Sequence, residues 1–88
     1  MTLKEFNDYV RDEGFKYDYD KDKYYMDYEN GVRLSLKYLE LRNGSSIHAT
    51  CSYGSCMYGC FSDTSAEEAR AKALKGIEPE VKKGMKSQ

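Results

Sequence analysis

The sequence predicts an α+β fold in which an antiparallel sheet of three or four strands carries an N-terminal and a C-terminal helix on one face, in the order α-β-β-β-α. Turn signals at Asn30-Gly31, Asn43-Gly44 and Gly54-Ser55 separate stretches in which apolar and polar residues alternate. Helix-capping patterns occur near both ends of the chain. With 88 residues, 40% of them hydrophobic, we expect a single domain over 1–78 and a frayed polar tail over 79–88.

The first helix is predicted over residues 3–13. Thr2 and Glu5 have the spacing of a capping box, in which each side chain bonds the backbone amide of the other residue. Gly14 is placed to end the helix in a left-handed conformation. Apolar side chains recur at helical spacing: Leu3, Phe6 and Val10.

Tyrosine and acidic residues interleave between residues 15 and 29, which predicts strands with a turn over the Asp/Lys run 20–23. We expect a three-residue loop at 29–31 with Gly31 as a bulge, because a two-residue loop would place Asp27 opposite Leu34 on the apolar face. The bulged loop pairs Tyr28 with Val32, Met26 with Leu34 and Tyr24 with Leu36.

Strands 32–41 and 46–53, joined by a turn at Asn43-Gly44, continue the sheet. This turn predicts the pairs Leu34–Tyr53, Leu36–Cys51 and Tyr38–Ala49. One face is then apolar, with Val32, Leu34, Leu36, Tyr38, Ile47, Ala49, Cys51 and Tyr53. The other face is mostly polar, with Arg33, Ser35, Lys37, Leu39, Ser46, His48, Thr50 and Ser52.

The second helix is expected to begin at a cap supplied by Thr64 or Ser65, with Glu67 or Glu68 completing a capping box. Gly76 or Pro79 is expected to end it. A stripe of small and apolar residues would let this helix lie close to the sheet: Ala66, Ala69, Ala73, Leu74 and Ile77.

His48, Cys51, Cys56 and Cys60 follow one another like a set of metal ligands. Their spacing, H-x2-C-x4-C-x3-C, does not match the short knuckles of zinc sites. A turn at Gly54-Ser55 places the three cysteines on the apolar face and His48 on the other. We therefore interpret the cysteines as core residues and expect no metal and no cofactor.

Asp18, Asp20, Asp22 and Glu29 occupy positions 1, 3, 5 and 12 of an EF-hand-like loop. Lys23 stands at position 6, where the sharp turn of a calcium loop requires glycine. A strand rather than a helix is expected to follow. We interpret the segment as a solvated, acidic pair of strands.

The sequence predicts no enzyme, because His48 is the only imidazole and the chain shows no nucleophile–base pair and no phosphate loop. Three cysteines, an odd number, favour a reducing cytoplasm over a secreted disulfide framework. The first six residues lack the apolar core of a signal peptide, and no apolar run is long enough to cross a membrane.

Gly59-x-Phe61 and the later run from Ser65 to Leu74 (SAEEARAKAL) resemble a double-stranded-RNA-binding domain. The resemblance implies a helix–three strands–helix scaffold over residues 1–77. Glu67 and Glu68 stand at the positions where that family carries phosphate-gripping lysines, and two carboxylates would repel a phosphate backbone. The resemblance thus implies the scaffold without the RNA-binding function.

We expect a non-enzymatic interaction protein that binds a basic surface of a partner protein, such as a site that normally holds nucleic acid. In size and acidity the chain is similar to phage-encoded inhibitors of host defence, including anti-CRISPR proteins. Residues 1–30 carry nine acids and five bases. Tyrosine and carboxylate side chains suit such an interface, and the expected contacts are Tyr19, Asp20, Asp22, Tyr25, Asp27 and Glu29.

The alternative function is nucleic-acid binding across the polar sheet face with help from the second helix. A pI of about 5.8 disfavours it, because nucleic-acid binders usually carry a clustered basic surface. The residues that would carry it are Arg33, Lys37, Arg42 and His48, with Lys72 or Lys75 from the helix.

Overall fold

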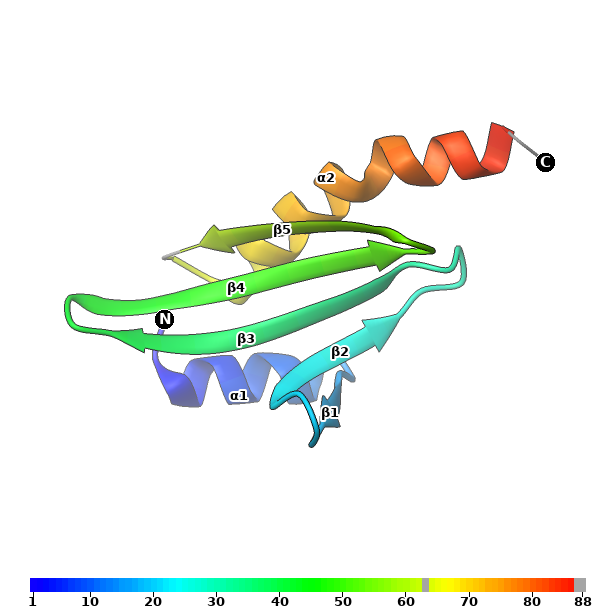
Figure 1. Cartoon of the computed structure of the whole chain (residues 1–88). Coiled ribbons are helices and arrows are strands. Elements are labelled where there is room, and N and C mark those ends of the chain that lie inside the picture. Colours follow the sequence, from blue (N-terminus) through cyan, green and yellow to red (C-terminus); the bar gives the residue numbers. More distant parts are fainter. Residues whose placement is uncertain (63, 87–88) are drawn as a thin grey trace.

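Five antiparallel strands form one sheet, and both helices pack on the same face of it (Figure 1). The structure is a computed structural model that describes residues 1–62 and 64–86. The elements are α1 (Leu3–Asp12), β1 (Lys16–Asp18), β2 (Lys23–Asp27), β3 (Arg33–Leu41), β4 (Gly44–Tyr53), β5 (Cys56–Ser62) and α2 (Ala66–Lys86). The strands follow chain order across the sheet. The predicted α+β class is confirmed, and the short β1 brings the number of strands to five.

The capping box at the start of α1 is formed as predicted. The Thr2 hydroxyl accepts a hydrogen bond from the Glu5 amide at 3.1 Å, and the Glu5 carboxylate accepts one from the Thr2 amide at 2.9 Å. Gly14 follows the helix with a φ of +84°, which only glycine adopts at little cost. Phe6 is buried against Tyr24 and Tyr38, with 5.7 Å between ring centroids in each pair, so α1 is seated on β2 and β3.

The bulged loop between β2 and β3 is confirmed. Tyr24 lies opposite Leu36, and Met26 lies opposite Leu34. The Tyr28 amide donates to the Val32 carbonyl at 2.8 Å, and Gly31 has a φ of +92°. The register therefore follows from the rule that carboxylates stay off the apolar face.

The predicted register between β3 and β4 is wrong by two residues. Leu36 pairs with Ala49 rather than Cys51, and Tyr38 pairs with Ile47 rather than Ala49. Gly44, with a φ of +138°, is the first residue of β4 and pairs with Leu41, so the loop consists of Arg42 and Asn43. Since two residues is the repeat of a strand, both predicted faces survive the shift.

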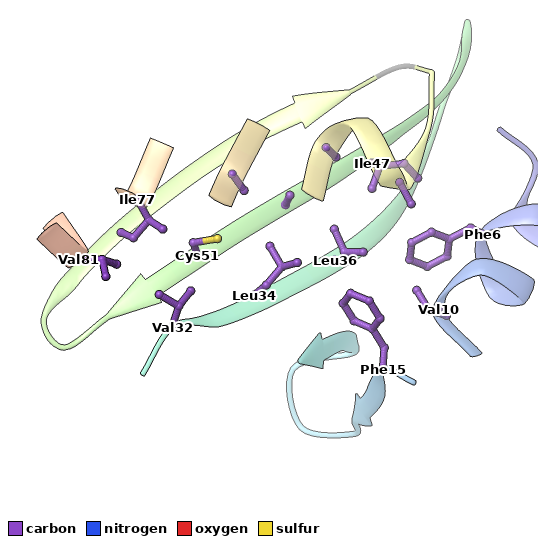
Figure 2. Packing of buried hydrophobic residues seen from close by; sticks show 14 residues of the cluster. Phe6, Val10, Phe15, Val32, Leu34, Leu36, Ile47, Cys51, Ile77 and Val81 are labelled. Atoms are coloured by element: carbon purple, nitrogen blue, oxygen red, sulfur yellow. The ribbon is translucent and has the colours of Figure 1, made fainter. Parts of the chain in front are cut away.

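A single apolar core lies between the sheet and the two helices (Figure 2). Ala66, Ala69 and Ala73 have no exposed surface, because the alanine stripe brings α2 close to β4 and β5. Sheet residues fill the opposite side of the core: Val32, Leu34, Leu36, Ile47, Ala49 and Cys51.

The expectation that the second helix ends at Gly76 or Pro79 is wrong, and so is the boundary at residue 79. The helix continues through Pro79 to Lys86. Pro79 lacks the amide that would bond the Lys75 carbonyl, but burial of Ile77 and Val81 on the sheet outweighs the loss of that bond. Residues 79–86 thus belong to the folded domain, and residues 87–88 of the predicted tail lie outside the described residues.

Candidate functional site

The sheet face opposite the helices is covered by neither of them, and we call it the open face (Figure 1). Strand alternation places on it Lys16, Asp18, Lys23, Tyr25, Asp27, Arg33, Ser35, Lys37, Leu39, Ser46, His48, Thr50, Ser52, Met57, Gly59 and Phe61. Four of these residues are Lys or Arg and two are Asp, which gives a net charge of +2. The open face is therefore mildly basic on a chain whose net charge is −1.

Arg33 and Asp27 form a forked ion pair on the open face. The guanidinium donates to the two carboxylate oxygens at 2.6 and 3.0 Å, and its central carbon lies 4.6 Å from the centre of the Tyr25 ring. The hydrogen bond from Arg33 holds the pKa of Asp27 below its usual value. The two charges thus offset each other, while both side chains remain about half exposed.

His48 and Phe61 form an aromatic stack at the other side of the open face. Their ring centroids are 4.4 Å apart and the planes are inclined by 18°. Gly59 lies beside this stack, and a Cβ there would come within 3.3 Å of His48 Nε2. Phe61 remains 58% exposed, so the stack is a flat aromatic patch on a mostly polar face.

The turn between β1 and β2, residues 19–22, carries two aspartates and is held by hydrogen bonds; we call it the acidic turn. The Asp18 carboxylate accepts hydrogen bonds from the amides of Asp20 at 3.0 Å and Lys21 at 3.2 Å. Asp22 has a φ of +53°, in the left-handed region that aspartate tolerates better than most residues. Its carboxylate accepts a hydrogen bond from the Tyr17 hydroxyl. These bonds fix the turn from both sides.

Tyr19 projects from the acidic turn and is 88% exposed. Its ring contacts that of Tyr17 edge to face, with 4.8 Å between centroids, and Tyr17 contacts Tyr24 in the same way at 5.0 Å. The Asp22 carboxylate that accepts the Tyr17 hydrogen bond raises the pKa of Tyr17 to about 12. The tyrosine chain links Tyr19 to the core while leaving most of its ring in solvent.

The predicted partner-binding residues lie in three places along the β1–β2 ribbon. Tyr19, Asp20 and Asp22 belong to the acidic turn at the start of β2. Tyr25 and Asp27 lie on the open face, and Glu29 is exposed in the loop after β2. The acidic turn and Glu29 are therefore at opposite ends of β2, and Asp27 is engaged by Arg33.

The residues predicted for nucleic-acid binding are divided between the two sides of the sheet. Lys37 and His48 are paired on β3 and β4, so they share the open face with Arg33, and Arg42 lies in the adjacent β3–β4 turn. Lys72 and Lys75 belong to α2, which packs on the opposite face. A ligand lying flat on the open face would meet the sheet residues without these two lysines.

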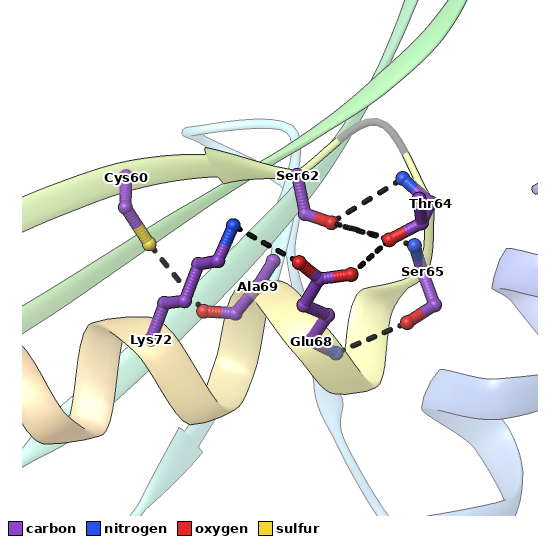
Figure 3. Close-up of polar contacts among 7 residues, drawn as sticks. All are labelled: Cys60, Ser62, Thr64, Ser65, Glu68, Ala69 and Lys72. Atoms are coloured by element: carbon purple, nitrogen blue, oxygen red, sulfur yellow. Dashed lines mark hydrogen bonds and ion pairs between the residues drawn. The ribbon is translucent and has the colours of Figure 1, made fainter.

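The cysteines face α2 and His48 does not, as the predicted faces required. Cys60 donates to the Ala69 carbonyl at 3.4 Å, and Cys56 donates to the Glu80 carboxylate at 3.5 Å (Figure 3 shows the Cys60 contact). Cys51 is fully buried, and that burial raises the pKa of its thiol to about 11. Among the described residues, no three His, Cys, Asp or Glu side chains are grouped so that they could hold a metal ion.

Glu67 and Glu68 lie in the first turn of α2. Ser65 rather than Thr64 supplies the cap, since its hydroxyl accepts from the Glu68 amide at 3.1 Å (Figure 3). The Glu68 carboxylate accepts from the Thr64 hydroxyl and pairs with Lys72 at 3.0 Å. These two partners lower the pKa of Glu68 and hold its carboxylate at the start of α2.

Two features escaped the sequence reasoning. The first is the exposure of β5, where Met57 is 71% exposed and Tyr58 41%. The second is Arg70, whose guanidinium donates to the Tyr28 hydroxyl at 2.9 Å and to Glu13 at 3.0 Å. Both depend on which elements become neighbours, so no local pattern marks them.

Comparison with known proteins gives no relative from which a function could be transferred: no family model, curated protein or solved structure matches this chain. Neither helix within the described residues combines the length and the apolar character needed to cross a membrane.

Proposed function

We propose that this chain is a non-enzymatic protein-interaction module whose acidic turn, together with Glu29, binds a basic surface of a partner protein. The observation that carries the proposal is Tyr19, an 88% exposed aromatic ring presented by a turn that is itself fixed by hydrogen bonds. Tyrosines of this kind are favoured at interfaces because they bury a large area at a small cost in conformational entropy.

The charges around Tyr19 support a basic partner. Residues 17–29 contain five acids and two bases, which gives a net charge of −3. The carboxylates of Asp20 and Glu29 make no hydrogen bond or ion pair with the residues that the structure describes. Their charge is available to a basic site, including one that normally holds nucleic acid, as in the phage-encoded inhibitors that the chain resembles in character.

The test is affinity capture from a lysate of the source organism with three variants. Tyr19→Ala removes the exposed ring, Asp20→Lys with Glu29→Lys reverses two unpaired charges, and Glu40→Lys with Glu67→Lys reverses two exposed charges elsewhere. We expect the wild type and the Glu40/Glu67 variant to capture the same protein and the other two to lose it. Capture should also weaken as salt is raised.

Circular dichroism spectra and thermal melts of all variants establish that they fold. If the Asp20/Glu29 variant folds and still captures the partner at full yield, the acidic surface is not the binding site.

The open face favours a second candidate function, binding of single-stranded nucleic acid. An uncovered antiparallel sheet with aromatic rings and nearby cations suits stacked bases. Here the exposed Phe61 and the partly buried His48 and Tyr25 supply the rings. Lys37, beside His48, makes no ion pair with the residues that the structure describes. The ion pair between Arg33 and Asp27 and the net charge of only +2 make this candidate the weaker one.

Titration with single-stranded DNA and RNA oligonucleotides separates the two functions. Base stacking on the open face should shift the amide signals of residues 33–50 and of Phe61, and the affinity should fall steeply with salt. It should also fall in Phe61→Ala and remain unchanged in Tyr19→Ala. Oligonucleotides that shift none of these signals at low salt would exclude the second candidate.

A further inference from the structure

The strand β5 forms one edge of the sheet, and no other strand among the described residues pairs with its outer side. It is seven residues long, and it contains no charged residue and no proline (Cys56–Ser62, CMYGCFS). The opposite edge, β1, has only three residues, and Lys16 and Asp18 are two of them. Natural proteins usually protect an edge with charge, proline or short length, and β1 follows that rule while β5 does not.

The outward-facing backbone groups of β5 belong to Met57, Gly59 and Phe61. Tyr53 and Cys56 flank the two-residue loop at Gly54-Ser55, so they form a hydrogen-bonded pair, and every second residue of β5 after Cys56 bonds β4. The residues between them direct their N–H and C=O groups away from β4. Gly59 is exposed, and because it has no side chain, the exposed surface is that of its backbone.

We propose that a second copy of this chain pairs with β5, in antiparallel orientation, around a twofold axis at Gly59. This register places Gly59 opposite Gly59 of the second copy and Met57 opposite its Phe61. The three outward residues of each strand then satisfy one another's hydrogen bonds. In the single chain Met57 is 71% and Phe61 58% exposed. In the dimer each Met57 packs against Phe61 of the other copy, and the twofold axis repeats this contact.

The choice of a second copy as occupant follows from the symmetry of the strand. Met57 and Phe61 lie equally far on either side of Gly59 and share the open face, so the surface is complementary to itself. On the helix side, Tyr58 would lie opposite Cys60 of the second copy, and neither carries a charge. The helix charges beside β5 are paired within α2: Glu68 pairs with Lys72 at 3.0 Å. Glu80, which accepts a hydrogen bond from Cys56, pairs with Lys83 at 3.7 Å.

The association is closed. Pairing of two β5 edges gives a ten-stranded sheet that ends at both sides in β1, from five strands in each copy. Because β1 is short and charged, further copies have no long edge to extend. The expected product is a dimer rather than a fibre.

Sedimentation equilibrium over a roughly hundredfold range of concentration tests the proposal. The mass should rise from 10.2 kDa toward twice that value. In the same range, hydrogen exchange at the amides of Met57, Gly59 and Phe61 should slow as concentration increases. A mass of one chain at every concentration would overturn the proposal. The occupant of the β5 edge would then have to be a strand from another protein.

Charge substitutions test the register. Met57→Lys with Phe61→Lys places like charges opposite each other and should abolish the dimer, whereas Met57→Glu with Phe61→Lys places opposite charges there and should restore it. Leu3→Lys with Leu41→Lys removes two other exposed apolar residues and should leave the dimer unchanged. A dimer that persists in the double-lysine variant, or that is lost in the Leu3/Leu41 variant alone, would contradict pairing through β5.

Discussion

At the scale of single residues, the cysteines illustrate how position decides chemistry. Burial raises the pKa of Cys51 and of Cys60, and the hydrogen bond from Cys56 to Glu80 raises the pKa of Cys56. A thiol with a raised pKa holds less thiolate at a given pH, and the thiolate is the nucleophile. The three side chains are therefore suited to packing and poorly suited to redox or metal chemistry.

We predict that all three thiols react with alkylating reagents at pH 8 more slowly than free cysteine does. Cys51 should react only on unfolding, since no part of it is exposed. Mass spectrometry of the alkylated protein over time, with and without denaturant, measures these rates. Rapid labelling of Cys51 in the folded chain would contradict its burial.

We also predict that burial of Cys51 makes the free energy of unfolding depend on pH. Burial raises the pKa of its thiol from the ordinary 9.0 to about 11, so the thiol contributes stability below pH 9 that is lost as the pH rises through 11. Denaturant titrations at several pH values should show the free energy of unfolding falling in this window. The fall should be smaller in Cys51→Ala, whatever the absolute stability of that variant.

Arg70 joins three elements through one side chain. Burial would lower the pKa of its guanidinium, but hydrogen bonds to the Tyr9 and Tyr28 hydroxyls outweigh burial and raise it. An ion pair with Glu13 completes its contacts with α1. Arg70 is thus a structural cation rather than one offered to a ligand.

We predict that Arg70→Lys lowers the free energy of unfolding by about 2 kcal/mol, because an ammonium group cannot donate in all these directions from one position. Chemical denaturation measures the loss. Lys72→Arg, an exchange in the opposite sense on the exposed side of α2, is the matched control and should change stability little.

At the scale of elements, α2 depends on glycine where aromatic side chains cross it. A Cβ at Gly76 would lie 2.1 Å from the Tyr58 ring, and one at Gly84 would lie 2.6 Å from the Tyr53 hydroxyl. Glycine inside a helix usually costs stability. Here it allows two tyrosines of the β4–β5 hairpin to pack against the helix.

We predict that Gly76→Ala destabilises the chain, although alanine is the better helix former by about 1 kcal/mol. The added methyl group must displace Tyr58. In a Tyr58→Ala background the same substitution should instead stabilise. A double-mutant cycle from thermal melts gives the coupling, and independent effects of the two substitutions would show that the ring does not rest on Gly76.

For Pro79, in the same helix, we predict the opposite effect of an alanine substitution on stability. Pro79→Ala should stabilise α2 by up to about 3 kcal/mol, because it restores an amide to a helix interior. Lys75→Ala, at an exposed position one turn earlier, should change stability by a few tenths at most. A loss of stability in Pro79→Ala would show that the last two turns are not helical in solution.

At the scale of the whole molecule, both helices pack on one face of the sheet. The other face and the two sheet edges therefore remain accessible to other molecules. The edges differ: β1 ends in the acidic turn, and β5 is the proposed dimer edge. In the dimer the two acidic turns would lie at opposite ends of a single sheet. The proposed function and the proposed dimer then occupy separate surfaces and can be tested independently.

We predict that dimerisation slows dissociation from a surface on which the captured partner is immobilised densely, because both acidic turns can bind at once. The Met57→Lys/Phe61→Lys variant should dissociate faster from a dense surface than the wild type and at the same rate from a sparse one. Equal rates on both surfaces would mean that only one acidic turn engages.

Much of the fold could be predicted from local patterns. Thr2 and Glu5 specified the helix start, and the exclusion of Asp27 from the apolar face specified the bulged loop. The faces of β3 and β4 survived an error of two residues because side chains alternate with that period. The same alternation separated His48 from the cysteines. The acidic turn was also visible in the sequence, as a run of Asp and Lys between tyrosines.

By itself, then, the sequence determined the order and type of the elements and the faces of the strands, because these follow from propensities and spacings within a few residues. Tertiary structure decided what no short window contains. It carried α2 past Pro79 through burial of Val81, it placed Arg70 against Tyr28 and Glu13, and it left β5 at an edge with Met57 and Phe61 exposed. Which side chains remain accessible depends on contacts between residues far apart in the chain, and accessibility decides what can bind.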